Sequence, residues 1–254
     1  MTQHICGIAI FNSTSNNLNN NTVKDNWIGI YLYQSNSTNI TWNIITGNGG
    51  GISTYDSNST TMSGNSLTDN WLADTSTVNS ANMVMATTIY TCGPAALATV
   101  MKHLGVNATE MELAQWAGTD ETGTSMWGLA QAANRTGLTA KGFIINDTSQ
   151  LKTDYIVVLN INGVYHYNII RNITNTTVYL TDPNLGDIEM SLDKFKELFT
   201  GYVLVVANGT IQINATNMTE QQMKNIKAMS HYDIYCYCIY YCHDGYSYNF
   251  RDLD

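Results

Sequence analysis

Apolar and polar positions repeat every 22 residues over the first part of the chain. Written in register, residues 7–72 form the copies GIAIFNSTSNNLNNNTVKDNWI, GIYLYQSNSTNITWNIITGNGG and GISTYDSNSTTMSGNSLTDNWL. The apolar residues stand in short alternating groups broken by Gly and Asn, which is typical of short strands and not of an amphipathic helix. Three strands per copy, stacked about 4.8 Å from those of the next copy, satisfy this pattern. Residues 1–72 are therefore predicted to form a parallel β-helix of three rungs.

Two asparagine positions recur in every copy of the repeat. One set is Asn21, Asn43 and Asn65, and the other is Asn26, Asn48 and Asn70. Stacked asparagines can bond to one another from rung to rung, so both sets predict hydrogen-bonded ladders at the turns. Three rungs bury little apolar surface and leave open ends that need caps, so we expect further rungs before Met1.

The pattern changes after residue 72. Residues 73–86 lose the period and are predicted to be a linker, residues 87–207 to be a folded domain, and residues 208–254 to be a Tyr- and Cys-rich tail. Within the domain, helical patterns cover 93–104, 109–117, 125–135 and 192–199, and β-rich runs fill most of the sequence after residue 137. Helices that precede strands in this way predict an α+β domain with an antiparallel sheet.

The stretch TIYTCGPAALATVMKHLG places Cys92 directly before Gly93, Pro94 and the first predicted helix of this domain. The N-terminal end of a helix carries positive partial charge, which stabilises a thiolate. Gly93 would let a substrate backbone approach closely, and Pro94 suits the first helical turn, where no N–H is needed. Taken alone, Cys92 fits a catalytic nucleophile and a buried structural cysteine about equally well.

Two further residues make the catalytic interpretation more specific. A nucleophilic cysteine needs a histidine within hydrogen-bond reach, and a third polar group must orient that histidine. His166 lies in the predicted strand VYHYNIIRN, on the same face as Asn168. Asp182 ends the next predicted strand, from where its carboxylate can reach the imidazole. A strand histidine by itself is usually a half-buried residue whose hydrogen bonds are satisfied, but the three residues together favour a catalytic triad.

The motifs YTCGPAALATV, GVYHYNIIRN and VYLTDPNLGDI resemble those of bacteriocin-processing cysteine peptidases that cleave after double-glycine leaders, and more closely those of their stand-alone relatives on archaeal surface proteins. The resemblance covers about residues 81–207 and implies a papain-like fold and a thiol hydrolase. It implies that Cys92 is the nucleophile, His166 the general acid and base, and Asp182 its orienting partner. The preceding repeats resemble the right-handed parallel β-helix repeats of carbohydrate-active and adhesin proteins.

One position departs from the pattern of the peptidase family. The family has a glutamine six residues before the nucleophile, where its amide helps to form the oxyanion hole, and this chain has Ala86. Loss of one such donor costs about 10²–10³ in rate. Thr87 and Thr88 are the candidate substitutes. Two interpretations stay open: a cysteine peptidase with weakened activity, and a non-catalytic surface adhesin whose peptidase domain is degenerate.

Charge and composition limit the kinds of molecule that the chain is expected to bind. The chain has 11 Lys and Arg against 20 Asp and Glu, with a net charge of −9, and it lacks the basic clusters that bind nucleic acid. We expect a peptide or protein substrate and no cofactor. Few charges and many Asn, Thr and Ser residues favour an extracellular or cell-surface location with cell-wall association. The start MTQHICGIAI shows no signal peptide, so we expect either a truncated N-terminus or a misassigned start.

Other candidate sites are weaker. The charged residues of the repeats do not align between copies, which favours a spacer or binding stalk over a carbohydrate-active enzyme. They are Lys24, Asp25, Asp56 and Asp69. The cysteines and histidine of the tail match no common zinc pattern, so no metal site is predicted. They are Cys236, Cys238, Cys242 and His243.

Overall fold

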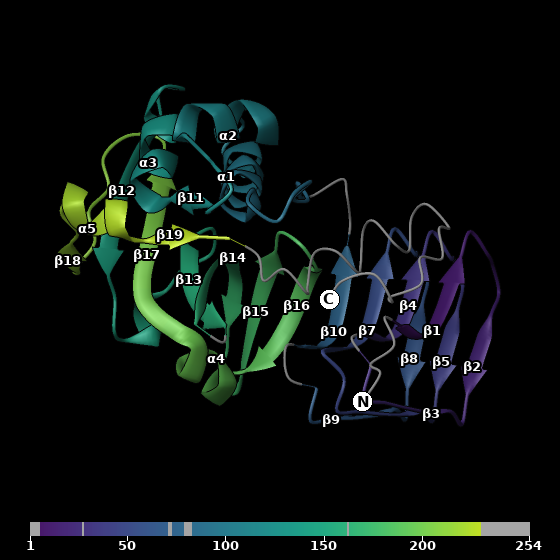
Figure 1. The fold of residues 1–254 in the computed structure, drawn as a ribbon. Helices are drawn as coiled ribbons and strands as arrows, with labels where there is room; N and C mark the ends of the chain where they lie inside the picture. Colours follow the sequence, from purple (N-terminus) through teal and green to yellow (C-terminus); the bar gives the residue numbers. More distant parts are fainter. Residues whose placement is uncertain (1–5, 27, 71–72, 79–82, 162, 230–254) are drawn as a thin grey trace, which may run out of the picture.

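The computed structural model describes residues 6–26, 28–70, 73–78, 83–161 and 163–229 (Figure 1). The repeats form three ladders of parallel strands. The first ladder contains β1 (Cys6–Phe11), β4 (Ile28–Tyr33) and β7 (Gly50–Tyr55). The second contains β2 (Asn17–Asn19), β5 (Asn39–Thr41) and β8 (Thr61–Ser63), and the third β3 (Thr22–Lys24), β6 (Ile44–Thr46) and β9 (Ser66–Thr68). Each strand pairs with the strand at the same position of the next copy, as in Ile8 with Ile30 and Ile30 with Ile52.

Side chains that point between the ladders hold this stack together. Its buried apolar residues are Val23, Ile30, Leu32, Ile40, Ile45 and Ile52. The predicted asparagine ladders are confirmed: the amide of Asn21 donates to Asn43 Oδ1 at 2.9 Å, and the amide of Asn43 donates to Asn65 Oδ1 at 3.0 Å. The buried Asn43 amide also reaches the main-chain carbonyl of Leu18, at 2.9 Å. These side chains satisfy backbone groups at the turns that no strand partner reaches.

Residues 73–78 are not part of a linker but form a fourth strand of the first ladder, β10 (Ala73–Val78). This strand pairs in parallel with β7 and in antiparallel with β16 (Gly186–Ser191), so one eleven-stranded sheet runs through both parts of the chain. Thr75 pairs with Ile52, a step of 23 residues instead of 22. Because of the extra residue and the absence of the repeat's Gly and Asn positions, this strand does not follow the 22-residue pattern in the sequence.

The second part has the predicted α+β order. Helices α1 (Cys92–His103), α2 (Glu110–Ala117) and α3 (Met126–Asn134) lie together on one side of the sheet (Figure 1). The sheet strands are β12 (Thr139–Ile144), β13 (Ile156–Ile161), β14 (Val164–Ile173), β15 (Thr177–Asp182), β16 and β17 (Phe199–Ala207), and α4 (Leu192–Leu198) precedes β17. Thr109 caps α2 in the predicted capping box with Glu112.

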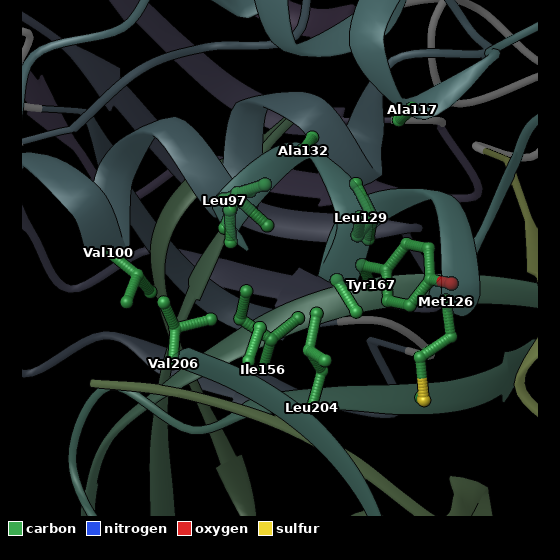
Figure 2. Close-up of a cluster of buried hydrophobic side chains, with 14 of the residues drawn as sticks. Leu97, Val100, Ala117, Met126, Leu129, Ala132, Ile156, Tyr167, Leu204 and Val206 are labelled. Carbon is green, nitrogen blue, oxygen red and sulfur yellow. The ribbon is translucent and has the colours of Figure 1, made fainter. Parts of the chain in front are cut away.

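Apolar side chains fill the space between the helices and the sheet (Figure 2). Leu97 and Val100 of α1 face Ile156, Leu204 and Val206 of the strands, and all five are buried. A second cluster around Phe195 covers the opposite face of the sheet. The N-terminal end of α1 is thereby held against β14, the strand that carries His166.

Residues 208–229 are part of the folded domain, contrary to the predicted tail boundary at residue 208. They contain β18 (Thr216–Asn217), α5 (Glu220–Asn225) and β19 (Lys227–Ala228), which pairs with β11 (Thr124–Ser125). Met223 and Ala228 are buried in the cluster between helices and sheet. These elements are too short to show a clear period in the sequence. The cysteines of the tail lie outside the described residues.

We predict that Asn43→Ala destabilises the repeat stack by about 3 kcal/mol, because it leaves buried backbone groups without partners. Chemical denaturation of the full chain, followed by far-UV circular dichroism, measures this loss. The matched control is Asn17→Ala in β2, where the side chain is exposed. Equal denaturation midpoints for the two variants would contradict the role of the ladder.

Candidate active site

Cys92 is the first residue of α1 and is fully buried. The helix begins after a turn in which the Thr88 hydroxyl lies 3.0 Å from that of Thr91 and accepts from the Tyr90 N–H at 3.2 Å. Pro94 occupies the first helical turn, as predicted from its missing N–H. The sulfur of Cys92 is therefore attached to the positive end of the helix macrodipole.

The structure assigns a different role to Gly93 from the one predicted. A Cβ at this position would lie 2.9 Å from Cδ2 of Tyr167 and 3.1 Å from Cδ1 of Leu129. Tyr167 projects from β14 toward Leu129 of α3 (Figure 2). Gly93 is thus required for the close packing of α1 on these two side chains, and it is buried in that contact.

His166 and Asp182 form a buried pair on neighbouring antiparallel strands. The His166 Nε2 lies 2.9 Å from Oδ2 of Asp182, and each side chain is only 2% exposed. The other carboxylate oxygen, Oδ1, accepts hydrogen bonds from the backbone N–H groups of Asn184, at 2.8 Å, and Leu185, at 3.2 Å. Three donors therefore fix the carboxylate at the end of β15.

The surroundings of His166 favour its charged form. Burial by itself lowers the pKa of His166, but the negative charge of Asp182, and after it that of Cys92, raises this pKa well above its ordinary value of 6.5. Because Asp182 takes Nε2, the other ring nitrogen, Nδ1, is the one available to the Cys92 sulfur. Nδ1 is buried, and the interaction of the ring with the Cys92 side chain adds to the raised pKa of His166. The imidazole therefore interacts with both Asp182 and Cys92.

Tyr167 also lies close to the thiol but fits a packing role. Burial, followed by the charge of Cys92, raises the pKa of the Tyr167 hydroxyl well above its ordinary value of 10.0. This hydroxyl reaches the carbonyl oxygens of Thr124, at 3.3 Å, and Ile226, at 3.4 Å. Tyr167 therefore stays neutral, and its hydroxyl connects β14 to the segments around Thr124 and Ile226 on the helix side of the sheet.

Ala86 lies next to the turn that follows Asp182. Its N–H donates to the carbonyl of Pro183 at 2.8 Å, and its methyl group is buried and offers no hydrogen-bond donor. Of the two candidate substitutes, Thr87 is exposed and its N–H bonds to Glu110 at 2.7 Å. The hydroxyl of Thr88 is engaged in the turn before α1. The structure therefore brings together Cys92, His166 and Asp182, and Ala86 supplies no side-chain donor.

Asn168 is a third buried polar residue of this region. The sequence analysis placed it on the same face of the strand as His166 but assigned it no role. Its side chain is completely buried, and neither atom of its amide group has a hydrogen-bond partner within the described residues. The pairing of Ile169 with Thr181 puts Asn168 opposite Asp182 in the next position of the ladder. The alternation with His166 along one strand was the signal for this placement.

The described part of the chain offers no other site of this kind. Within it, no group of three or more His, Cys, Asp or Glu side chains is arranged to hold a metal ion. No helix in the same residues is long and apolar enough to cross a membrane.

Comparison with known proteins agrees with the geometry. Residues 80–211 match the peptidase C39 family, and residues 1–90 match the periplasmic copper-binding protein (NosD) family. A functionally uncharacterised protein of Methanothermobacter thermautotrophicus is 47% identical over 124 residues, which are 49% of this chain and 87% of that protein. The lactococcin-G-processing and transport ATP-binding protein LagD of Lactococcus lactis subsp. lactis is 26% identical over 118 residues, which are 44% of this chain and 17% of LagD.

Among solved structures, the peptidase domain of Streptococcus ComA, a bifunctional ABC transporter, covers 50% of this chain and 98% of that domain. Its sequence identity is 24% and its TM-score is 0.46. The match of residues 80–211 to the peptidase C39 family spans half of the sequence, and it confirms the resemblance to bacteriocin-processing peptidases that three short motifs indicated. The chain belongs to the peptidase C39 family.

Proposed function

We propose that the chain is a cysteine peptidase that hydrolyses peptide bonds through Cys92, His166 and Asp182. The observation that carries this proposal is the buried His166–Asp182 pair, whose second ring nitrogen is left for a thiol at the start of a helix. Membership of a peptidase family supports the reaction class. A structural cysteine would not need a histidine whose pKa is raised by a buried carboxylate.

In the proposed mechanism, His166 takes the thiol proton on Nδ1 and the Cys92 thiolate attacks the carbonyl carbon of a peptide. The tetrahedral intermediate collapses as the C–N bond breaks, and His166 returns the proton to the leaving amine. This leaves a thioester on Cys92. His166 then removes a proton from water, which attacks the thioester carbon. The C–S bond breaks, the acid product leaves, and the Cys92 thiolate and protonated His166 are regenerated. Asp182 keeps the ring oriented and stabilises the imidazolium in both steps.

The oxyanion hole is the weakest part of this mechanism. The backbone N–H of Cys92, in the first turn of α1, is one donor for the developing negative charge. Ala86 supplies no second donor. A second candidate function follows from this observation: a domain that binds peptides as part of a surface adhesin and no longer cleaves them.

Substrate and location follow from the two halves of the chain. LagD is a lactococcin-G-processing protein, which supports peptide processing as the activity. The resemblance of the three motifs makes double-glycine leaders one proposed substrate class. A cell-wall peptide crosslink is the alternative if the protein works at a surface. We propose that the three ladders form a short right-handed parallel β-helix that acts as a stalk for the peptidase domain. The match of residues 1–90 to a periplasmic family supports a place outside the cytoplasm.

The pH dependence of alkylation tests the proposed thiolate. We expect iodoacetamide to label Cys92 at pH 6 and pH 8.5 at rates that differ by only a few-fold. An ordinary thiol of pKa about 8.5 would be about 100-fold slower at pH 6. Mass spectrometry of the peptide that contains Cys92 measures the rate separately from the other cysteines, and Cys92→Ala is the blank. Loss of the pH 6 reactivity in His166→Ala would support the ion pair, whereas labelling of the native chain that rises only near pH 8.5 would leave the adhesin function.

Asp182→Asn tests the orienting carboxylate. Because Asp182 raises the pKa of His166, the variant should lose the His166 proton at lower pH than the native protein. The charged pair stabilises the fold fully below about pH 6.5, and this stabilisation is lost as the pH rises through the raised pKa. The difference in unfolding free energy between native and variant protein should therefore be larger at pH 6 than at alkaline pH. A difference that is independent of pH would argue against the pair.

Ala86→Gln tests the missing oxyanion donor. We expect the variant to cleave a leader-derived peptide up to about 10²-fold faster, because a side-chain amide would stabilise the transition state. Ala86→Met is the matched control, since methionine has nearly the same length and no donor. The measurement is kcat/KM for both variants and the native chain. An equal effect of Gln and Met would mean that the side-chain volume, and not the amide, is responsible.

A further inference from the structure

Residues 226–229, here called the strap, run as an extended segment between β11 and β14 (Figure 1). On one side, Lys227 and Ala228 pair with Ser125 and Thr124 of β11. The N–H of Met126 also donates to the carbonyl of Ile226 at 2.9 Å. On the other side, the N–H of Met229 donates to the carbonyl of Tyr165 at 2.9 Å. The strap is thus held on both sides by main-chain hydrogen bonds.

The strap is attached to segments that carry the triad. Tyr165, which accepts from Met229, directly precedes His166 in β14. The hydroxyl of Tyr167 reaches the carbonyl of Ile226 at 3.4 Å, and the ring of Tyr167 packs on Gly93, the residue after Cys92. With the strap in place, Cys92, His166 and Asp182 are 0%, 1% and 2% exposed, so solvent does not reach their side chains.

Proteins commonly bind an extended peptide by adding it as a strand, so that main-chain hydrogen bonds hold its backbone. A peptidase needs unoccupied main-chain groups of this kind beside its nucleophile and base. Here the carbonyl next to His166 and the N–H of Met126 are both used by the strap. A substrate that used these groups would have to replace it.

We propose that the strap is an autoinhibitory segment that occupies in cis the groove for the extended backbone of a peptide substrate. This inference rests on the proposed function, because the groove matters only if Cys92 acts on peptides. The strap lies beyond residues 80–211, the part of the chain that matches the peptidase family. Met223 of the preceding helix α5 belongs to the buried cluster between helices and sheet, as do Ile226 and Ala228 of the strap. Release of the strap therefore exposes the side chains of Ile226 and Ala228, while Met223 keeps α5 attached.

One exposed ion pair fastens the strap to the domain. Nζ of Lys227 lies 2.7 Å from both carboxylate oxygens of Asp120, and the hydrogen bond from Lys227 is the largest cause that lowers the pKa of Asp120. Gly123, in the same turn, has a φ of +100° and lies so close to the carbonyl of Ala228 that a side chain would exclude the strap. The ion pair can be removed without touching the triad or the buried core.

The test measures iodoacetamide labelling of Cys92 at pH 8.5 in the full chain. Asp120→Asn should speed labelling about two- to fivefold, the effect of losing one surface ion pair on an opening equilibrium. Glu197→Gln, which breaks the surface pair of Lys194 and Glu197 on α4, is the matched control and should leave the rate unchanged. The exchange of both charges, Asp120→Lys with Lys227→Asp, should restore the native rate. If thermal unfolding shows that Asp120→Asn is poorly folded, Lys227→Met removes the same pair from the other partner.

A second arm tests whether the groove binds peptide. The synthetic peptide NIKAM, which repeats residues 225–229, should slow the labelling of Asp120→Asn when it is added in excess, and the scrambled peptide MKNAI should not. Equal labelling rates for Asp120→Asn and the native chain, or no effect of NIKAM, would overturn the strap proposal. If the native chain keeps its reactivity at pH 6 in that case, the proposed function stands and only the strap fails. Faster labelling of Asp120→Asn without reactivity at pH 6 would show that the strap covers Cys92, but it would reject the thiolate and the autoinhibitory role with it.

Discussion

The buried hydrogen bond between His166 and Asp182 is the interaction on which the site depends. A charged imidazole is costly in a protein interior unless a carboxylate lies beside it, and the carboxylate in turn needs its own donors. Asp182 has these donors in the turn after β15, and the antiparallel pairing of β14 with β15 brings the two side chains together. The third partner comes from α1, which approaches β14 closely because Gly93 leaves space for the ring of Tyr167. The arrangement of Cys92, His166 and Asp182 therefore depends on the charge of the buried pair, on the pairing of β14 with β15, and on the packing of α1 against β14.

The repeat stack and the peptidase domain are joined by strand pairing, because β10 pairs with β7 on one side and with β16 on the other. The strand β16 would be an exposed edge of the sheet if β10 did not pair with it, and β10 covers one end of the first ladder. On the domain side, Asp187 of β16 accepts from the hydroxyl of Thr181 at 2.6 Å and pairs with Arg171 at 3.0 Å. These contacts connect the end of the stack to β15, the strand that ends in Asp182. The N-terminal stack thus pairs with β16, the strand next to the one that ends in Asp182.

Besides His166, β14 carries a second completely buried polar side chain, that of Asn168. The amide of Asn168 is buried without a hydrogen-bond partner in the described part of the chain, which costs about 1–3 kcal/mol. Buried polar groups without a hydrogen-bond partner are rare in native proteins, and each one calls for an explanation such as a functional role. Ala86, by contrast, is buried without a polar side-chain group, and its backbone N–H donates to the carbonyl of Pro183.

The sequence by itself determined the features that depend on local or strictly periodic contacts. Equal positions of successive copies pair with one another, so the 22-residue period predicted the ladders and their asparagines. The capping residue of α2 and the order of Cys92, His166 and Asp182 along three elements were equally readable. Other features were decided by contacts between distant segments: the pairing of β10 with β16, the packing role of Gly93, the position of Asn168 opposite Asp182, and the docking of Met229 beside His166. None of these has a local signature, because each depends on which backbone groups and cavities the rest of the chain leaves unoccupied, and only the tertiary structure determines that.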